Sequence, residues 1–112
     1  MLTWRISFAT LESHPEQKGN PPRVKNSRRW YYIFDTVRQS LELVSASPAH
    51  VVRQRIFIVD LQLDHRPIIM KAMTDFYGDQ GSASSTCVGV QALLVEGAVV
   101  EIDITAVVDV ST

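Results

Sequence analysis

The chain has 112 residues, of which 46% are hydrophobic and 21% are charged, with 11 basic side chains against 12 acidic ones. This length suits one compact domain over residues 1–112. The formal net charge of −1 argues against a surface built for nucleic acid or for an anionic membrane.

The first predicted element is a strand, because Leu2, Trp4, Ile6 and Phe8 alternate with polar or small residues. Residues 12–27 contain three prolines together with glycine and asparagine. These residue types interrupt regular structure, so the segment is predicted to be a long loop.

A helix of about four turns is predicted after this loop, with Asn26 or Ser27 suited to cap its first turn. Pro48 marks the turn that follows, and the β-branched residues of segment 51–61 predict a well-buried strand. The apolar stripe of the helix consists of Trp30, Ile33, Phe34, Val37, Leu41 and Val44.

The second helix is predicted to begin with Asp64 as its N-cap, to hold Pro67 in its first turn and to end at Gly78. A loop is expected over residues 79–85, followed by a strand over residues 87–93. The last strand alternates most clearly. Its apolar face carries Val100, Ile102, Ile104, Ala106 and Val108, and its polar face carries Glu101, Asp103, Thr105 and Asp109.

This order of elements predicts an α+β fold, a two-layer sandwich in which a mixed β-sheet carries two helices on one face. Arg5 in the N-terminal apolar run is not typical of a signal peptide, and no apolar stretch approaches the ~20 residues that span a bilayer. The only cysteine, Cys87, excludes an intrachain disulfide. His14, His50 and His65 lack metal-ligand spacing. We therefore expect a cytoplasmic protein with no membrane segment, metal or other cofactor.

Five segments carry a resemblance to a known family: "VRQSLELV", "HVVRQRIFIVDL", "DFYGD", "STCVGV" and "GAVVEIDITAV". Over roughly residues 36–108 the sequence resembles the RidA/YjgF family of imine-deaminase-related proteins. The resemblance implies a chorismate-mutase-like fold and a homotrimer with a central β-barrel. It also implies small-molecule clefts between the subunits.

The resemblance further implies hydrolysis of reactive enamines or imines. In the family an arginine holds the substrate carboxylate through paired hydrogen bonds, and a glutamate on the last strand activates water. Glu101 matches this glutamate, Cys87 matches a cysteine found two residues after the arginine, and Ser7 matches a serine near the cleft.

The family arginine itself has no match, because Ser84 or Ser85 takes its place, depending on one gap. Met70 stands where the family often has asparagine, and Phe8 where it has glycine after the serine. We therefore expect a divergent member that binds a small metabolite, such as a carboxylate or a keto or imino acid, without the usual deaminase activity.

Simpler interpretations compete with these assignments. Glu101 also fits an ordinary solvated acid on a strand, and a lone cysteine in an apolar strand is usually a small buried hydrophobe. Two other functions stay open. One is an active deaminase whose cation comes from Arg5, Arg53 or Arg55. The other is a protein or nucleic-acid interaction module built on the basic aromatic segment 28–32.

Overall fold

A computed structural model describes residues 2–11, 27–80 and 83–109 of the chain. These residues form four strands and two α-helices, with short 3₁₀ turns η2 (Pro48–His50), η3 (Leu63–His65) and η4 (Gly78–Gln80). The strands are β1 (Leu2–Leu11), β2 (Val51–Val59), β3 (Ser84–Val90) and β4 (Ala98–Val108), and the helices are α1 (Ser27–Leu43) and α2 (Arg66–Tyr77). The predicted order of elements is confirmed.

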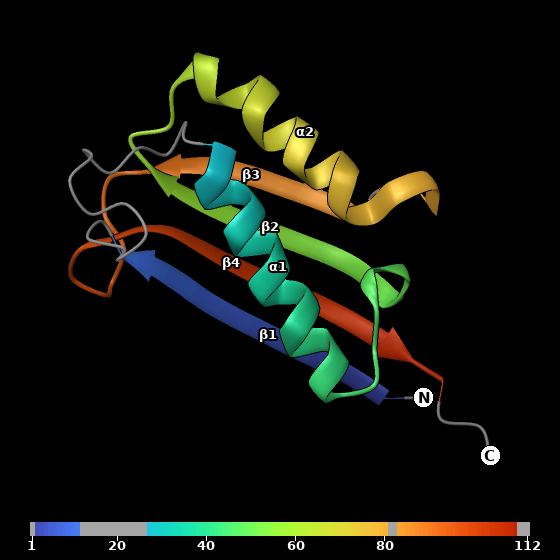
Figure 1. The fold of residues 1–112 in the computed structure, drawn as a ribbon. Helices are drawn as coiled ribbons and strands as arrows, with labels where there is room; N and C mark the ends of the chain where they lie inside the picture. Colours follow the sequence, from blue (N-terminus) through green and yellow to red (C-terminus); the bar gives the residue numbers. More distant parts are fainter. Residues whose placement is uncertain (1, 12–26, 81–82, 110–112) are drawn as a thin grey trace.

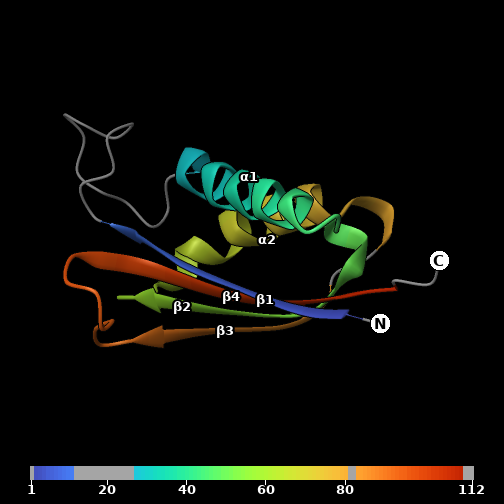
Figure 2. The same cartoon turned by 90° about the horizontal axis from the view of Figure 1, so that it is seen from below.

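The four strands form one mixed sheet in the order β1-β4-β2-β3. β4 pairs antiparallel with both β1 and β2, whereas β2 pairs parallel with β3. Both helices lie on the same side of the sheet, as Figures 1 and 2 show. We call this side the helix face and the other side, which no described helix covers, the open face. The predicted α+β sandwich of two layers is confirmed.

The hydrophobic core lies between the helices and the sheet. Alternating residues of β4 and β2 point into this core, and the apolar stripe of α1 packs against them from the helix side. The predicted apolar faces of the first helix and the last strand are therefore the buried faces. The fully buried members include Trp30, Ile33, Val37, Leu41, Ile56, Ile58, Ile102 and Ile104.

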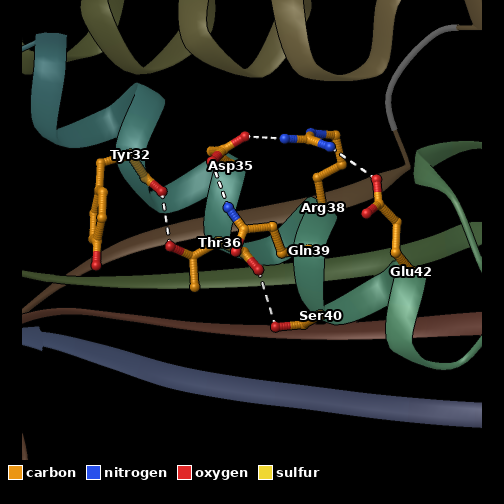
Figure 3. Close-up of polar contacts among 7 residues, drawn as sticks. All are labelled: Tyr32, Asp35, Thr36, Arg38, Gln39, Ser40 and Glu42. Atoms are coloured by element: carbon orange, nitrogen blue, oxygen red, sulfur yellow. Dashed lines mark hydrogen bonds and ion pairs between the residues drawn. The ribbon is translucent and has the colours of Figure 1, made fainter.

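The exposed polar side chains of α1 bind one another. Arg38 forms ion pairs with Asp35 and with Glu42, one turn away on each side (Figure 3). Between the helices, the hydroxyl of Tyr31 donates a hydrogen bond to Asp75 of α2. These contacts fix the helix layer without using residues of the core.

Several predicted boundaries differ from the structure, and β2 ends at Val59 and not at Leu61. β3 begins at Ser84 and ends at Val90, so the predicted loop residues Ser84 and Ser85 belong to the strand. Parallel pairing with β2 extends the strand to both serines despite their weak strand propensity. Asp64 lies in η3 and does not cap α2. The loop predicted over residues 12–27 lies almost wholly outside the described residues.

A buried amide, Gln54 of β2, lies at the centre of the core. Its Nε2 donates to the Ser85 hydroxyl at 3.0 Å and lies 3.0 Å from the Met73 sulfur. Its Oε1 accepts a hydrogen bond of 2.6 Å from the hydroxyl of Tyr77. Burial raises the pKa of Tyr77, so this hydroxyl keeps its proton. The network thus satisfies a polar group that would otherwise be costly to bury.

We expect Tyr77→Phe to lower the free energy of unfolding by about 1–3 kcal/mol, because it leaves the buried Gln54 carbonyl without a partner. Urea unfolding of the two proteins measures the difference. Tyr31→Phe is the matched control, because it removes a hydroxyl whose partner Asp75 is exposed and still bound to Lys71 at 3.2 Å. Equal effects of both substitutions would contradict a special role for the buried network.

Candidate functional site between α2 and β3

A cavity of about 570 Å³ opens between α2 and the edge strand β3 on the helix face. Its volume falls within the range usual for small-molecule sites. The lining is mainly apolar and is provided by Leu61, Gln62, Leu63, Arg66, Ile69, Met70, Met73, Ser85 and Cys87.

Helical spacing builds one wall of this cavity. Arg66, Ile69, Met70 and Met73 occupy positions i, i+3, i+4 and i+7 of α2, so they share one helix face. Ile69 and Met73 are buried, whereas Met70 is 53% exposed. The buried pair therefore forms the inner wall, and Met70 lies nearer the entrance.

Strand alternation builds the opposite wall. Ser85 and Cys87 pair with Gln54 and Ile56 of β2, and these two partners are buried on the helix face. The hydroxyl of Ser85 is held by Gln54. The wall thus offers one oriented hydroxyl and one thiol to the cavity.

The segment between β2 and α2 forms one end of the cavity. Gly89 permits this closure, because a Cβ at that position would lie 3.1 Å from the Cβ of Leu61. His65 then fixes the turn into α2: its ring Nδ1 accepts a hydrogen bond of 3.1 Å from the Gln62 N–H. The position of Arg66 at the start of α2 follows from this clamped turn.

Cys87 is exposed to solvent at the cavity, which corrects the interpretation as a buried hydrophobe. Desolvation nonetheless raises the pKa of its thiol. At neutral pH the group is a thiol and not the nucleophilic thiolate. The geometry therefore favours a lining role over a catalytic one.

A second group of polar residues lies on the open face, around a hollow of about 420 Å³. Its residues come from three adjacent strands, β1, β4 and β2. They are Arg5, Ser7, Arg55, Phe57, Glu101 and Asp103. Glu101 is half-buried there, and its side chain has no hydrogen-bond partner among the described residues.

Asp103 is the electrostatic centre of this group. Arg55 binds it through Nε at 3.0 Å and also through a terminal nitrogen, and Arg5 lies 3.4 Å away. Desolvation acts to raise the pKa of Asp103, but the hydrogen bonds and charges of Arg55 and Arg5 outweigh it and lower that pKa. Both arginines are thus engaged with a carboxylate of the chain.

The structure divides the residues predicted for the site between the two faces of the sheet. Ser85, Cys87 and Met70 line the α2–β3 cavity. Ser7 and Glu101 lie in the open-face hollow. Ser84 pairs with Arg53 and so also faces the open side. Within one chain, the glutamate and the cysteine do not share a cavity, and for Phe8 only the backbone in β1 is described.

Arg66 was missed by the sequence analysis, which considered Arg5, Arg53 and Arg55 as sources of a cation. All three lie on the open face, at alternating positions of β1 and β2. The spacing from Met70 was the available signal, because the residue one helical turn before Met70 is Arg66.

The basic aromatic segment 28–32 begins α1 and is divided between its two sides. Trp30 is completely buried and Arg29 is 2% exposed, whereas Arg28, Tyr31 and Tyr32 are exposed. Among the described residues, no cluster of histidine, cysteine and acidic side chains could hold a metal. No helix in the described part of the chain is long and apolar enough to cross a membrane.

The family model "Endoribonuclease L-PSP" matches residues 17–108 of the sequence. The chain belongs to this family, which is the RidA/YjgF family. Among curated proteins, no relative matches the sequence.

Most of the chain aligns with solved structures of Rid-family proteins. The Rid-family protein YyfB of Yersinia pestis, whose function is unknown, is 23% identical with a TM-score of 0.74, over 95% of this chain and 78% of that one. RidA of Psychrobacter is 19% identical with a TM-score of 0.70, over 95% and 80%. Rv2704 of Mycobacterium tuberculosis, a YjgF/YER057c/UK114 member, is 24% identical with a TM-score of 0.54, over 78% and 66%.

We expect Arg55→Gln in this RidA-family chain to raise the pKa of Asp103 and to lower the free energy of unfolding at neutral pH by about 1–2 kcal/mol. Because the folded-state pKa of Asp103 is lowered, its contribution is present above the unfolded value of ~3.9 and is lost as pH falls through the folded value. Urea unfolding from neutral to acidic pH measures this.

Arg5→Gln is the control for this prediction. Its side chain is 67% exposed, against 33% for Arg55, and it lies farther from Asp103. We expect a smaller loss. A difference between Arg55→Gln and the unaltered protein that persisted unchanged at acidic pH would contradict the assignment to Asp103.

Proposed function

We propose that this RidA-family chain binds a small metabolite in the α2–β3 cavity and hydrolyses imines poorly. The observation that carries the proposal is the position of Ser85. It lies two residues before Cys87, on the same face of β3 and in the same cavity. A hydroxyl is therefore present where the family resemblance implies an arginine.

The chemistry of Ser85 supports binding more than catalysis. A hydroxyl held by Gln54 can hydrogen-bond to a ligand oxygen, but it cannot form the charged pair of bonds that a guanidinium makes with a carboxylate. Glu101, the proposed water-activating acid, lies on the other face of the sheet in the same chain. An assembly would have to bring the two groups together.

A deaminase that uses Arg5, Arg53 or Arg55 in place of the family arginine is the weaker hypothesis. All three lie on the open face, away from the α2–β3 cavity, and the side chains of Arg5 and Arg55 already bind Asp103. If either of these two arginines moved away, the Asp103 carboxylate, which is only 12% exposed, would lose part of the positive charge that balances it.

The family description raises RNA cleavage as another activity, but the polar groups of the described residues do not favour it. The rings of His50 and His65 each accept a backbone N–H within their own turns, at 3.0 and 3.1 Å. Neither is poised as a general acid or base. With the net charge of −1, we propose that nucleic acid is not the ligand.

We expect hydrolysis of a freshly generated 2-imino acid by the unaltered protein to be close to the uncatalysed rate. Ser85→Arg should raise kcat/KM by about ten- to a hundredfold, because a charged hydrogen bond contributes about 1.5–3 kcal/mol. Met70 in place of the family asparagine limits the recovery. The measurement is the rate of 2-oxo acid release.

Ser84→Arg is the matched control, because it adds the same charge one residue away on the open face. It should leave the rate unchanged, and Glu101→Gln should barely alter the unmodified protein. Rapid turnover by the unmodified protein that disappears in Glu101→Gln would contradict the proposal. It would mean that the acid is catalytic and that another part of the chain supplies the cation.

We propose further that three copies assemble through their open faces, as the family resemblance implies. The open face carries apolar as well as polar side chains, with Phe57, Val59 and Val99 partly buried and Val88 38% exposed. A domain of this size leaves much of its surface uncovered, and association would cover this face.

Light scattering should therefore give three times the chain mass. Val88→Glu, which places a charge on the open face, should reduce the mass to that of one chain. Leu43→Glu is the control, because Leu43 is 87% exposed at the end of α1 and should tolerate the charge. A single-chain mass for the unaltered protein at all concentrations would refute the trimer.

A further inference from the structure

We propose that Arg66 of α2 holds the carboxylate of an aliphatic acid in the α2–β3 cavity. The ligand then lies with its charged end at the start of α2 and its other end toward Ser85. This inference rests on the proposed function, because it requires that the cavity binds a small molecule. It adds the chemical class of the ligand, its anchoring residue and its direction.

Charge within the cavity selects the ligand class. Arg66 is the only residue among the lining residues that carries a formal charge at neutral pH, since the raised pKa keeps Cys87 protonated. The side chain of Arg66 makes no ion pair or hydrogen bond within the described part of the chain. Its guanidinium is therefore available for two parallel hydrogen bonds to a carboxylate.

The position of Arg66 determines the direction of the ligand. α2 runs back along the sheet from the end of β2, so Arg66 lies near Leu61 and Met73 lies near Ser85. Seven residues of α-helix separate Arg66 from Met73, which is about 10 Å along the helix axis. A carboxylate at Arg66 therefore lies at the opposite end of the cavity from Ser85.

The surface between these two ends is apolar. Ile69 and Met73 of α2 are buried, and the Cys87 thiol faces them from β3. A hydrocarbon chain fits this middle region, and the Ser85 hydroxyl can accept or donate one hydrogen bond at the far end. An aliphatic carboxylic acid satisfies all three regions at once.

The turn before α2 keeps Arg66 in place before a ligand arrives. The His65 ring binds the Gln62 N–H, and the His65 N–H binds the Gln62 carbonyl at 3.0 Å. Because His65 is buried, this turn is anchored in the protein. The loss of conformational entropy when a ligand binds is therefore smaller, which favours affinity.

The test measures binding of acetate, butanoate, hexanoate and 6-hydroxyhexanoate, with hexanamide as the neutral counterpart of hexanoate. Affinity should rise about fourfold for each added methylene, and hexanoate should bind at least tenfold more tightly than hexanamide. In Arg66→Gln that preference for the acid should disappear. Arg66→Lys should retain part of it, since lysine keeps the charge but not the paired geometry.

Two controls make the test specific. Arg38→Gln removes an exposed arginine of α1 that binds Asp35 and Glu42 (Figure 3) and is not among the residues lining the cavity, so it should not alter binding. Hexanoate should also slow the alkylation of Cys87, the only cysteine, which places the acid in this cavity. In Arg66→Gln the same concentration should protect Cys87 less. Thermal unfolding verifies that each variant is folded.

The outcomes separate this inference from the proposed function. If hexanoate binds and protects Cys87, but Arg66→Gln keeps the full preference for the acid over the amide, the role of Arg66 is refuted and the binding function stands. If neither the acids nor the amide bind or protect Cys87, the proposed function fails and this inference fails with it. Loss of the preference in Arg66→Gln alone, with Arg38→Gln unaffected, supports both.

Discussion

Period-two alternation along β4 is the constraint on which the rest of the structure depends. β4 lies in the middle of the sheet, between β1 and β2, so its even-numbered residues set the helix face for both neighbours. Val100, Ile102 and Ile104 face the helices, and Glu101 and Asp103 therefore face away. A shift of one residue would bury both acids, which explains why a single register is stable.

Gln54 links this division of the sheet to the chemistry of the cavity. Both polar ends of its side-chain amide form hydrogen bonds within the protein, the oxygen with Tyr77 and the nitrogen with Ser85. The hydroxyl at position 85 is therefore part of the core as well as part of the cavity wall. A ligand that binds Ser85 competes with, or extends, a network that already stabilises the fold.

Much of this architecture could be predicted from the sequence, because local patterns determine it. The alternation of β4 and the stop at Gly78, where φ is 65°, depend on nearest neighbours. The side of the sheet that Ser84 and Ser85 face could not be predicted, because it depends on the parallel register between β3 and β2. The position of Arg66 in one cavity with Ser85 and Cys87 could not be predicted either, because the cavity joins elements that are far apart in the sequence.

The two faces of the sheet differ in the charge that they offer to an anionic ligand. On the open face, Arg5 and Arg55 are balanced by Glu101 and Asp103, so the formal charges of the hollow cancel. A carboxylate entering there would also meet two like charges. In the α2–β3 cavity, Arg66 is opposed by no acid among the lining residues, and the raised pKa of Cys87 prevents the thiol from adding a negative charge. Among the residues that line this cavity, the one formal charge at neutral pH is therefore positive and lies in the first turn of α2.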